Sequence, residues 1–140
     1  MLYKKLGTEA IERNWKLNCC MNDYFKIPPT LIIPKSVWKI GYYAFRGCYK
    51  LKEVVIPGSV DWIAEGAFCY CMNLKKVIIS TSVWKIGTCA FYECSNAEII
   101  LPKPKRLFRV GMNAFYNCKS VVEDVKEKTR NRSDREKLGL

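Results

Sequence analysis

The chain has 140 residues, a length that suits one domain, and 49% of them are apolar. Its 13% aromatic content excludes a disordered chain, because such chains are poor in aromatic residues. The net charge is +11, from 24 Lys and Arg against 13 Asp and Glu. The last 18 residues are nearly neutral, with 6 basic and 5 acidic residues, so the body of the chain holds the positive charge and favours an anionic partner.

The first predicted element is a helix over residues 8–25, within an N-terminal helical cap over residues 1–30. Thr8 is a suitable N-cap, Ile11 and Trp15 lie on one apolar face, and Pro28 and Pro29 end the helix. A helix that binds a partner is the alternative to a cap. The first 17 residues contain six charged side chains, which excludes a signal peptide there, and no apolar run reaches the length of a transmembrane helix.

Residues 31–122 contain four copies of one unit. Ala-Phe pairs recur at 44–45, 67–68, 90–91 and 114–115, at spacings of 23, 23 and 24 residues, and a Cys follows three residues after each Phe. Two residues inserted within 103–106 disturb the fourth unit. A period near 23 lies in the leucine-rich-repeat range. The predicted fold class is therefore a repeat solenoid of mainly short β-strands, with a short helical turn at each Ala-Phe pair.

The unit resembles the BspA-like leucine-rich repeat, L-x-x-I-x-I-P-x-S-V-x-x-I-G-x-x-A-F-x-x-C. The second copy matches it at Leu51, Val54, Ile56, Pro57, Ser59, Val60, Ile63, Ala67, Phe68 and Cys71. The resemblance implies a right-handed coil and a function in binding. Members of the family occur in bacterial surface proteins, parasitic protists and large DNA viruses. Because an export signal is not expected, we interpret the chain as intracellular or assembled into a virion, for example as a minor capsid-associated component of a giant virus, or as a protist protein.

The repeat predicts a structural core made of one Phe and one Cys per coil. These residues are Phe45, Cys48, Phe68, Cys71, Phe91, Cys94, Phe115 and Cys118. Free Cys packs well as a small buried residue, so we expect thiols, although neighbouring coils about 5 Å apart leave a disulfide open on distance alone. With no His and no C-x-x-C pair, neither a metal site nor a cofactor is expected.

A candidate partner-binding surface follows from the two positions that precede the conserved Ile or Val of the second extended piece. Its predicted members are Trp38, Lys39, Trp62, Trp84, Lys85, Phe108 and Arg109. Every coil contributes one aromatic residue, and we expect stacking to align them in one stripe, with Asp61 between Lys39 and Lys85. Exposed Trp and Arg are typical interface anchors. Aromatic residues that only cover each other's stems are the alternative.

Residues 123–140 are expected to form a charged C-terminal tail. The predicted function is a non-enzymatic interaction or scaffold module for a protein partner with an acidic surface. A basic solenoid that binds nucleic acid is the alternative, since aromatic residues between cations can stack bases and grip phosphates. An enzyme is not expected, because the chain has no His, no G-x-S-x-G elbow and no P-loop.

Overall fold

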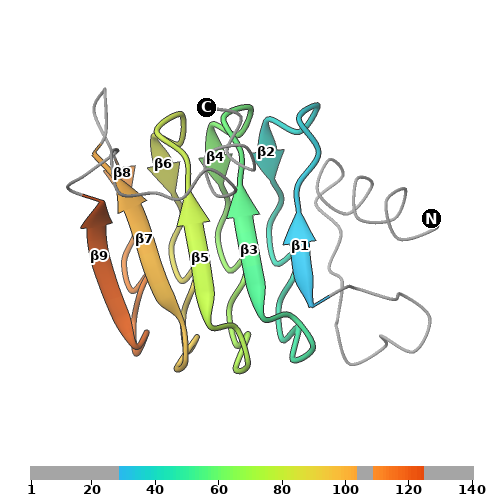
Figure 1. The fold of residues 1–140 in the computed structure, drawn as a ribbon. Coiled ribbons are helices and arrows are strands. Elements are labelled where there is room, and N and C mark those ends of the chain that lie inside the picture. Colours follow the sequence, from blue (N-terminus) through green and yellow to red (C-terminus); the bar gives the residue numbers. More distant parts are fainter. Residues whose placement is uncertain (1–28, 104–108, 125–140) are drawn as a thin grey trace.

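The structure, a computed structural model, describes residues 29–103 and 109–124, and this part of the chain is a β-solenoid of about four coils. Each coil contributes one strand to each of two sheets of parallel strands and then returns through a run of turns (Figure 1). In the view of Figure 1, the chain runs up the front sheet, whose strands run from blue to red, crosses to the back and comes down there. Each further coil lies to the left of the one before it, so the coil is right-handed. The expected repeat solenoid is therefore confirmed. The predicted helix at 8–25, residues 104–108 and the predicted tail beyond residue 124 lie outside the described residues.

The larger sheet has five parallel strands in the order β1-β3-β5-β7-β9. Their bounds are β1 Thr30–Ile32, β3 Glu53–Ile56, β5 Lys76–Ile79, β7 Glu98–Pro102 and β9 Ser120–Asp124. Branched residues such as Val54 and Ile78 suit a pleated, buried strand. Residues on alternate positions point to opposite faces, so Val54 lies in the main core, while Val55 and Ile78 form a second small apolar cluster on the other face, with Ile100 packed against it.

The smaller sheet has four parallel strands in the order β2-β4-β6-β8. Their bounds are β2 Lys39–Ile40, β4 Trp62–Ile63, β6 Lys85–Ile86 and β8 Arg109–Val110. Successive strands pair at offsets of 23, 23 and 24 residues, as in Lys39 with Trp62, Trp62 with Lys85, and Lys85 with Arg109. The repeat period therefore sets the strand register, and the insertion within 103–106 is absorbed between β7 and β8 without shifting the pairing of β8.

The third side of each coil contains the Ala-Phe pair. In place of a regular helical turn, the described residues form consecutive tight turns with two residues at positive φ per coil. These residues are Tyr43 and Gly47, Gly66 and Tyr70, Cys89 and Glu93, and Asn113 and Asn117. The backbone N–H groups alternate in direction. Phe68 N–H donates to Ala90 O at 2.7 Å in the next coil, whereas Cys71 N–H donates to Phe68 O within its own coil at 3.3 Å. A regular helix would use all of these donors internally, so the turns are what allows one coil to bond to the next.

A column of phenylalanine rings fills the centre of the solenoid. Phe45 and Phe68 stack with ring centroids 5.2 Å apart, Phe68 and Phe91 at 5.2 Å, and Phe91 and Phe115 at 5.8 Å. Phe68 has no exposed surface. The period of the repeat thus places one large apolar ring above another in every coil, which is how units that cannot bury their own apolar face form a shared core.

The cysteine column packs beside the phenylalanine column and bonds to it. The Cys71 thiol donates to Phe45 O at 3.1 Å, the Cys94 thiol to Phe68 O at 3.0 Å, and the Cys118 thiol to Phe91 O at 3.2 Å. Each of these thiols satisfies a carbonyl group of the preceding coil, in addition to filling a small volume.

Cys48 departs from the expected thiol packing, because it is disulfide-bonded in the structure. The other cysteines of the described part are free, namely Cys69, Cys71, Cys89, Cys94 and Cys118. Cys48 lies in the first described coil, and the three thiols that donate to a Phe carbonyl lie in the coils that follow.

Candidate interaction surface on the four-stranded sheet

The side chains on the outer side of the smaller sheet form two columns. The strand register aligns Lys39, Trp62, Lys85 and Arg109 in the first column. The second column contains Trp38, Asp61 and Trp84, since Asp61 N–H donates to Trp38 O at 2.8 Å and Trp84 N–H donates to Asp61 O at 3.0 Å. Phe108, the remaining predicted member of this surface, lies outside the described residues.

This arrangement corrects the expectation of one aromatic stripe. Asp61 lies between Trp38 and Trp84, and it is Trp62 that lies between Lys39 and Lys85. The reason is the order of residues in the second coil, where the aromatic residue follows its polar neighbour, whereas it precedes it in the first and third coils. The aromatic side chain therefore changes column from one coil to the next, and a lysine occupies each position next to Trp62.

The indole ring of Trp62 is held between two ammonium groups. Lys39 Nζ lies 3.8 Å from the ring centroid and Lys85 Nζ lies 4.2 Å from it. Because Lys39 belongs to the preceding coil and Lys85 to the following one, the two cations approach from opposite sides. Both distances are well within the roughly 6 Å at which a cation and a ring attract each other. We call the cluster of Lys39, Tyr42, Trp62 and Lys85 the lysine–tryptophan site.

Tyr42 is the member of this site that the sequence analysis did not assign to the surface. Its ring meets Trp62 edge to face at a centroid distance of 6.0 Å, and Lys39 Nζ lies 4.9 Å from its centroid. Tyr42 is also one of the exposed large side chains. A signal was present in the sequence, because Tyr42 follows Ile40 by two residues on a chain that has just left β2, but the repeat has no aromatic residue at the matching positions Glu65 and Thr88.

The charges of the lysine–tryptophan site are not balanced within it. Partial burial lowers the pKa of Lys39, and the positive charge of Lys85 lowers it further. In addition, Trp62 Nε1 is buried and has no hydrogen-bond partner within the described residues. A cation whose pKa is lowered by its surroundings can gain from an added carboxylate, which stabilises its charged form.

Exposure differs among the surface residues. Trp38 is 61% exposed, Arg109 is exposed, and Trp62, Trp84, Lys39 and Lys85 are half-buried. The structure thus brings six of the seven predicted residues to one face. Within it, Trp38 protrudes and Trp62 is held in place by its neighbours.

A second aromatic cluster lies on the turn side of the solenoid. Tyr92 stacks on Tyr116 at 5.0 Å and meets Tyr70 edge to face at 5.6 Å. The Arg46 guanidinium lies 5.7 Å from the Tyr70 ring and 5.8 Å from the Tyr43 ring. These side chains satisfy one another, so this cluster is less suited to an incoming charge.

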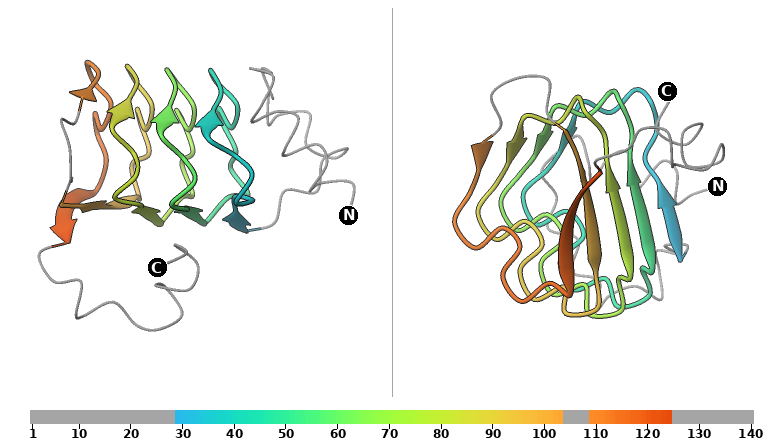
Figure 2. Two further views of the ribbon diagram at one scale, coloured as in Figure 1. Left: turned by 90° about the horizontal axis from the view of Figure 1, so that it is seen from above. Right: turned by 60° about the vertical axis from the view of Figure 1, so that its left-hand side comes forward.

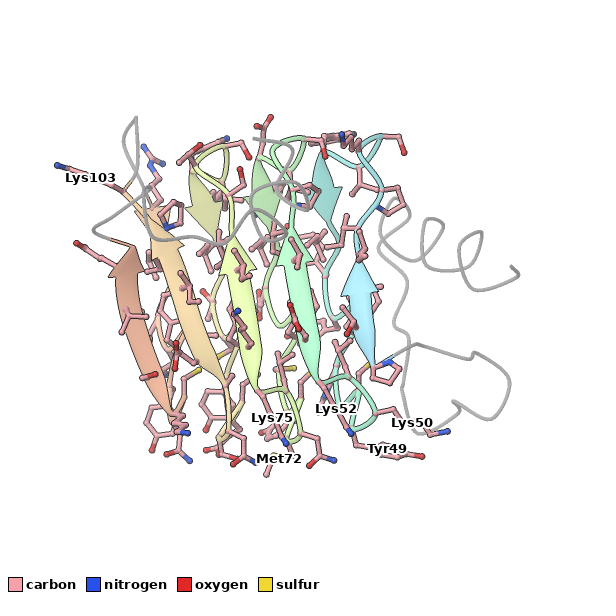
Figure 3. All side chains as sticks on the ribbon, viewed as in Figure 1. Tyr49, Lys50, Lys52, Met72, Lys75 and Lys103 are labelled. Atoms are coloured by element: carbon pink, nitrogen blue, oxygen red, sulfur yellow. The ribbon has the colours of Figure 1, made fainter. Side chains whose placement is uncertain are left out.

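A basic edge follows the bends between the turn side and the larger sheet. Figure 3 places Tyr49, Lys50, Lys52, Met72 and Lys75 together along this edge. All five are exposed. Lys50 Nζ lies 5.9 Å from the Tyr49 ring, near the limit of a cation–π contact, so these cations are held less closely than those around Trp62.

The comparison with protein-family models decides the identity of the fold. A model described as the BspA type leucine-rich repeat region matches residues 18–130, with six copies. The chain belongs to the BspA-type leucine-rich repeat family. No curated protein and no solved structure matches the chain.

In the BspA-type repeats of this chain, the pKa of three free thiols is raised, so that these thiols are held in the protonated form. Burial raises the pKa of Cys69 to about 11 and that of Cys118 to about 12, and the neighbouring Cys71 together with burial raises the pKa of Cys94.

In the described part of the chain, no three His, Cys, Asp or Glu side chains gather in a way that could hold a metal ion. Within residues 29–103 and 109–124, no helix is long and apolar enough to cross a membrane.

We expect the thiols of Cys69, Cys94 and Cys118 to react slowly in the folded protein. The thiolate is the reactive form, and pH 8 lies well below a pKa of about 11. Ellman's reagent at pH 8 should therefore modify most of the free thiols at a small fraction of the rate seen in urea. Cys89→Ser is the control, since Cys89 is only half-buried and should react faster than the buried thiols of the described residues. Equal rates for folded and unfolded protein would contradict the burial described here.

Proposed function

We propose that this chain is a non-enzymatic interaction module and that the outer face of its smaller sheet binds a protein partner through acidic side chains. The observation that supports this proposal most strongly is the Trp62 ring held between Lys39 and Lys85. Leucine-rich repeats in general serve protein interactions, which supports the module and leaves the identity of the partner to its surface chemistry.

The lysine–tryptophan site is organised before a partner arrives. A free lysine side chain loses rotamer freedom when it forms an ion pair, and this loss weakens most exposed pairs. Here the contacts of Lys39 with Trp62 and Tyr42 already restrict its ammonium group. Lys39 therefore loses less side-chain conformational entropy when it binds a partner carboxylate, because its ammonium group is already partly ordered in the free protein.

An acidic partner fits the charges better than a neutral one. Lys39, Lys85 and Arg109 share one column, and Asp61 is the one carboxylate in the adjacent column. A carboxylate within about 4–6 Å would stabilise the charged form of Lys39, whose pKa the surroundings now lower. Binding should then weaken as the salt concentration rises, because exposed charges are screened within about 10 Å at 0.1 M salt.

Trp38 and Trp84 supply the apolar part of the proposed contact. They lie two coils apart in one column, a separation of about 10 Å at the usual strand spacing. Large aromatic side chains with a polar neighbourhood are typical hot spots of protein interfaces. With two such anchors beside three cations, the face fits an acidic segment that carries apolar residues.

Replacing both anchors tests the proposal. The double variant Trp38→Ala, Trp84→Ala should abolish recovery of the partner in a pull-down, while its circular dichroism stays unchanged. The double variant Tyr49→Ala, Met72→Ala is a matched control, because it removes two exposed large side chains from the basic edge. Undiminished recovery with the first variant would count against the proposal.

The nucleic-acid alternative and the cellular setting have their own tests. A mobility-shift assay with a single-stranded oligonucleotide across salt concentrations examines the alternative, since phosphate contacts give a steep salt dependence. Binding that is absent even at low salt would rule out the nucleic-acid alternative.

The setting in the cytoplasm or in a virion is a separate hypothesis, which co-purification of the native protein and mass spectrometry of its partners would test.

A further inference from the structure

The two ends of the described solenoid differ in how well they cover the core. At the first coil, Leu31, Ile33 and Ile40 are buried, with at most 6% of their surface exposed. At the last coil, Val110 is 46% exposed and Val121 is 43% exposed, although both occupy core columns. Their partners in the preceding coil, Ile86 and Ile99, are buried. The apolar core therefore reaches the surface at the last coil.

This exposed end is also a sheet edge. β9 pairs with β7 on one side and with no other described strand, as the right-hand view of Figure 2 shows. Ser120 N–H donates to Ala97 O, so its polar backbone groups point toward β7. Backbone groups alternate in direction along a strand, so the N–H and C=O groups of Val121 and Glu123 point to the open side. Such an edge is a template for pairing with another strand.

The side chains of this edge form a self-complementary pattern. Val121 aligns with Ile99 and Glu123 with Leu101, both of which pack in or against the core, and Lys119 precedes them by the same period of two. The inward face of β9 thus reads Val121, Glu123, and Lys119 lies in the bend directly before the strand. If a second copy of this edge runs antiparallel with Val121 opposite Val121, each Lys119 lies opposite a Glu123.

The same register suits the backbone. Val121 would exchange both of its N–H···O bonds with the Val121 of the second copy, since its polar backbone groups point outward. The side chain of Lys119, just before the strand, would then lie near Glu123 of the second copy. The twofold axis is then perpendicular to the larger sheet. It would bring the two open ends face to face, so that Val110 and the 76% exposed Met112 also become covered.

We propose that the last coil is the interface of a twofold homodimer, with β9 pairing antiparallel to β9 of a second copy about Val121. At the first described coil the inward side chains Leu31 and Ile33 are buried, which disfavours the other simple arrangement, in which the last coil of one copy stacks on the first described coil of the next. The dimer would present two lysine–tryptophan sites, one on each copy. The proposal does not depend on what those sites bind.

Charge reversal tests the dimer with the full chain. Sedimentation velocity of the wild type at micromolar concentration should show a dimer. Lys119→Glu and Glu123→Lys should each weaken the dimer about tenfold or more, because each places two like-charged pairs opposite each other. The double variant Lys119→Glu, Glu123→Lys restores both pairs in reversed order, so it should regain the dimer.

A structural role of these residues within one copy predicts a different outcome. Both residues are exposed, so circular dichroism should show that each single variant stays folded. A wild type that sediments as a monomer would overturn the proposal, and hydrogen exchange that protects the Val121 amide in such a monomer would show that another part of the same chain covers the edge. A double variant that stays as weak as the single variants would overturn the proposed register.

Discussion

Phe68→Ala should lower the free energy of unfolding by about 3–5 kcal/mol, the range for removing a buried phenylalanine ring. Phe68 has no exposed surface and stacks on Phe45 and Phe91 at 5.2 Å on both sides. Since each coil contacts only its neighbours, a cavity in the second coil weakens the contact with the first and with the third. Urea unfolding followed by circular dichroism measures the loss.

Tyr70→Ala provides the matched control for this prediction. It removes a ring of similar size two residues away in the same coil, but Tyr70 is 43% exposed and its ring contacts lie on the surface. We expect the free energy of unfolding to change by about 1 kcal/mol or less. Equal effects of the two variants would mean that the phenylalanine column does not hold the coils together.

Gly87→Ala should cost about 1–3 kcal/mol, because it forces an atom into a close contact between backbones. A Cβ atom at Gly87 would lie 2.5 Å from Glu65 N and 2.7 Å from Ala64 C in the preceding coil. Both are backbone atoms fixed by the ladder, in which Gly87 N–H donates to Ile63 O at 2.7 Å. Because no flexible side chain can move aside, the coils themselves would have to separate. Thermal unfolding should show a lower midpoint.

Thr88→Ala is the control for Gly87→Ala, since Thr88 is the next residue and its side chain is exposed. We expect a change within about 0.5 kcal/mol for this surface position. A midpoint for Gly87→Ala equal to that of Thr88→Ala would show that the spacing between coils is looser than the structure indicates.

The sequence was sufficient to predict the solenoid, because its apolar residues recur in register. The period that separates Phe45, Phe68 and Phe91 equals the strand offset in both sheets over the first three coils. The form of the turns was not predictable in the same way. Tyr43, Tyr70, Cys89 and Glu93 adopt positive φ, which the identity of these residues does not suggest. Bonding to the next coil imposes that conformation.

The candidate site was predicted at the level of the face and not at the level of its contacts. The sequence analysis placed Lys39, Trp62 and Lys85 on one face but put Asp61 between the two lysines, and the contact of two cations with one ring depends on side-chain rotamers. The exchange of Asp61 and Trp62 relative to the other coils was visible in the sequence, and its consequence appears only when the register of β2, β4 and β6 is known. The disulfide of Cys48 was not predicted, because the repeat gives all four cysteines of its column the same position.

The most direct test of the proposed function compares two pairs of neutralised lysines. Lys39→Gln with Lys85→Gln and Lys50→Gln with Lys52→Gln remove the same charge, the first pair at the lysine–tryptophan site and the second on the basic edge. Equilibrium binding of the co-purified partner at 0.1 M salt is the measurement. We predict that the first pair lowers the affinity about tenfold, equivalent to about 1.4 kcal/mol, and that the second changes it little. Equal losses for the two pairs would contradict the account, because they would show that overall positive charge, and not this face, attracts the partner.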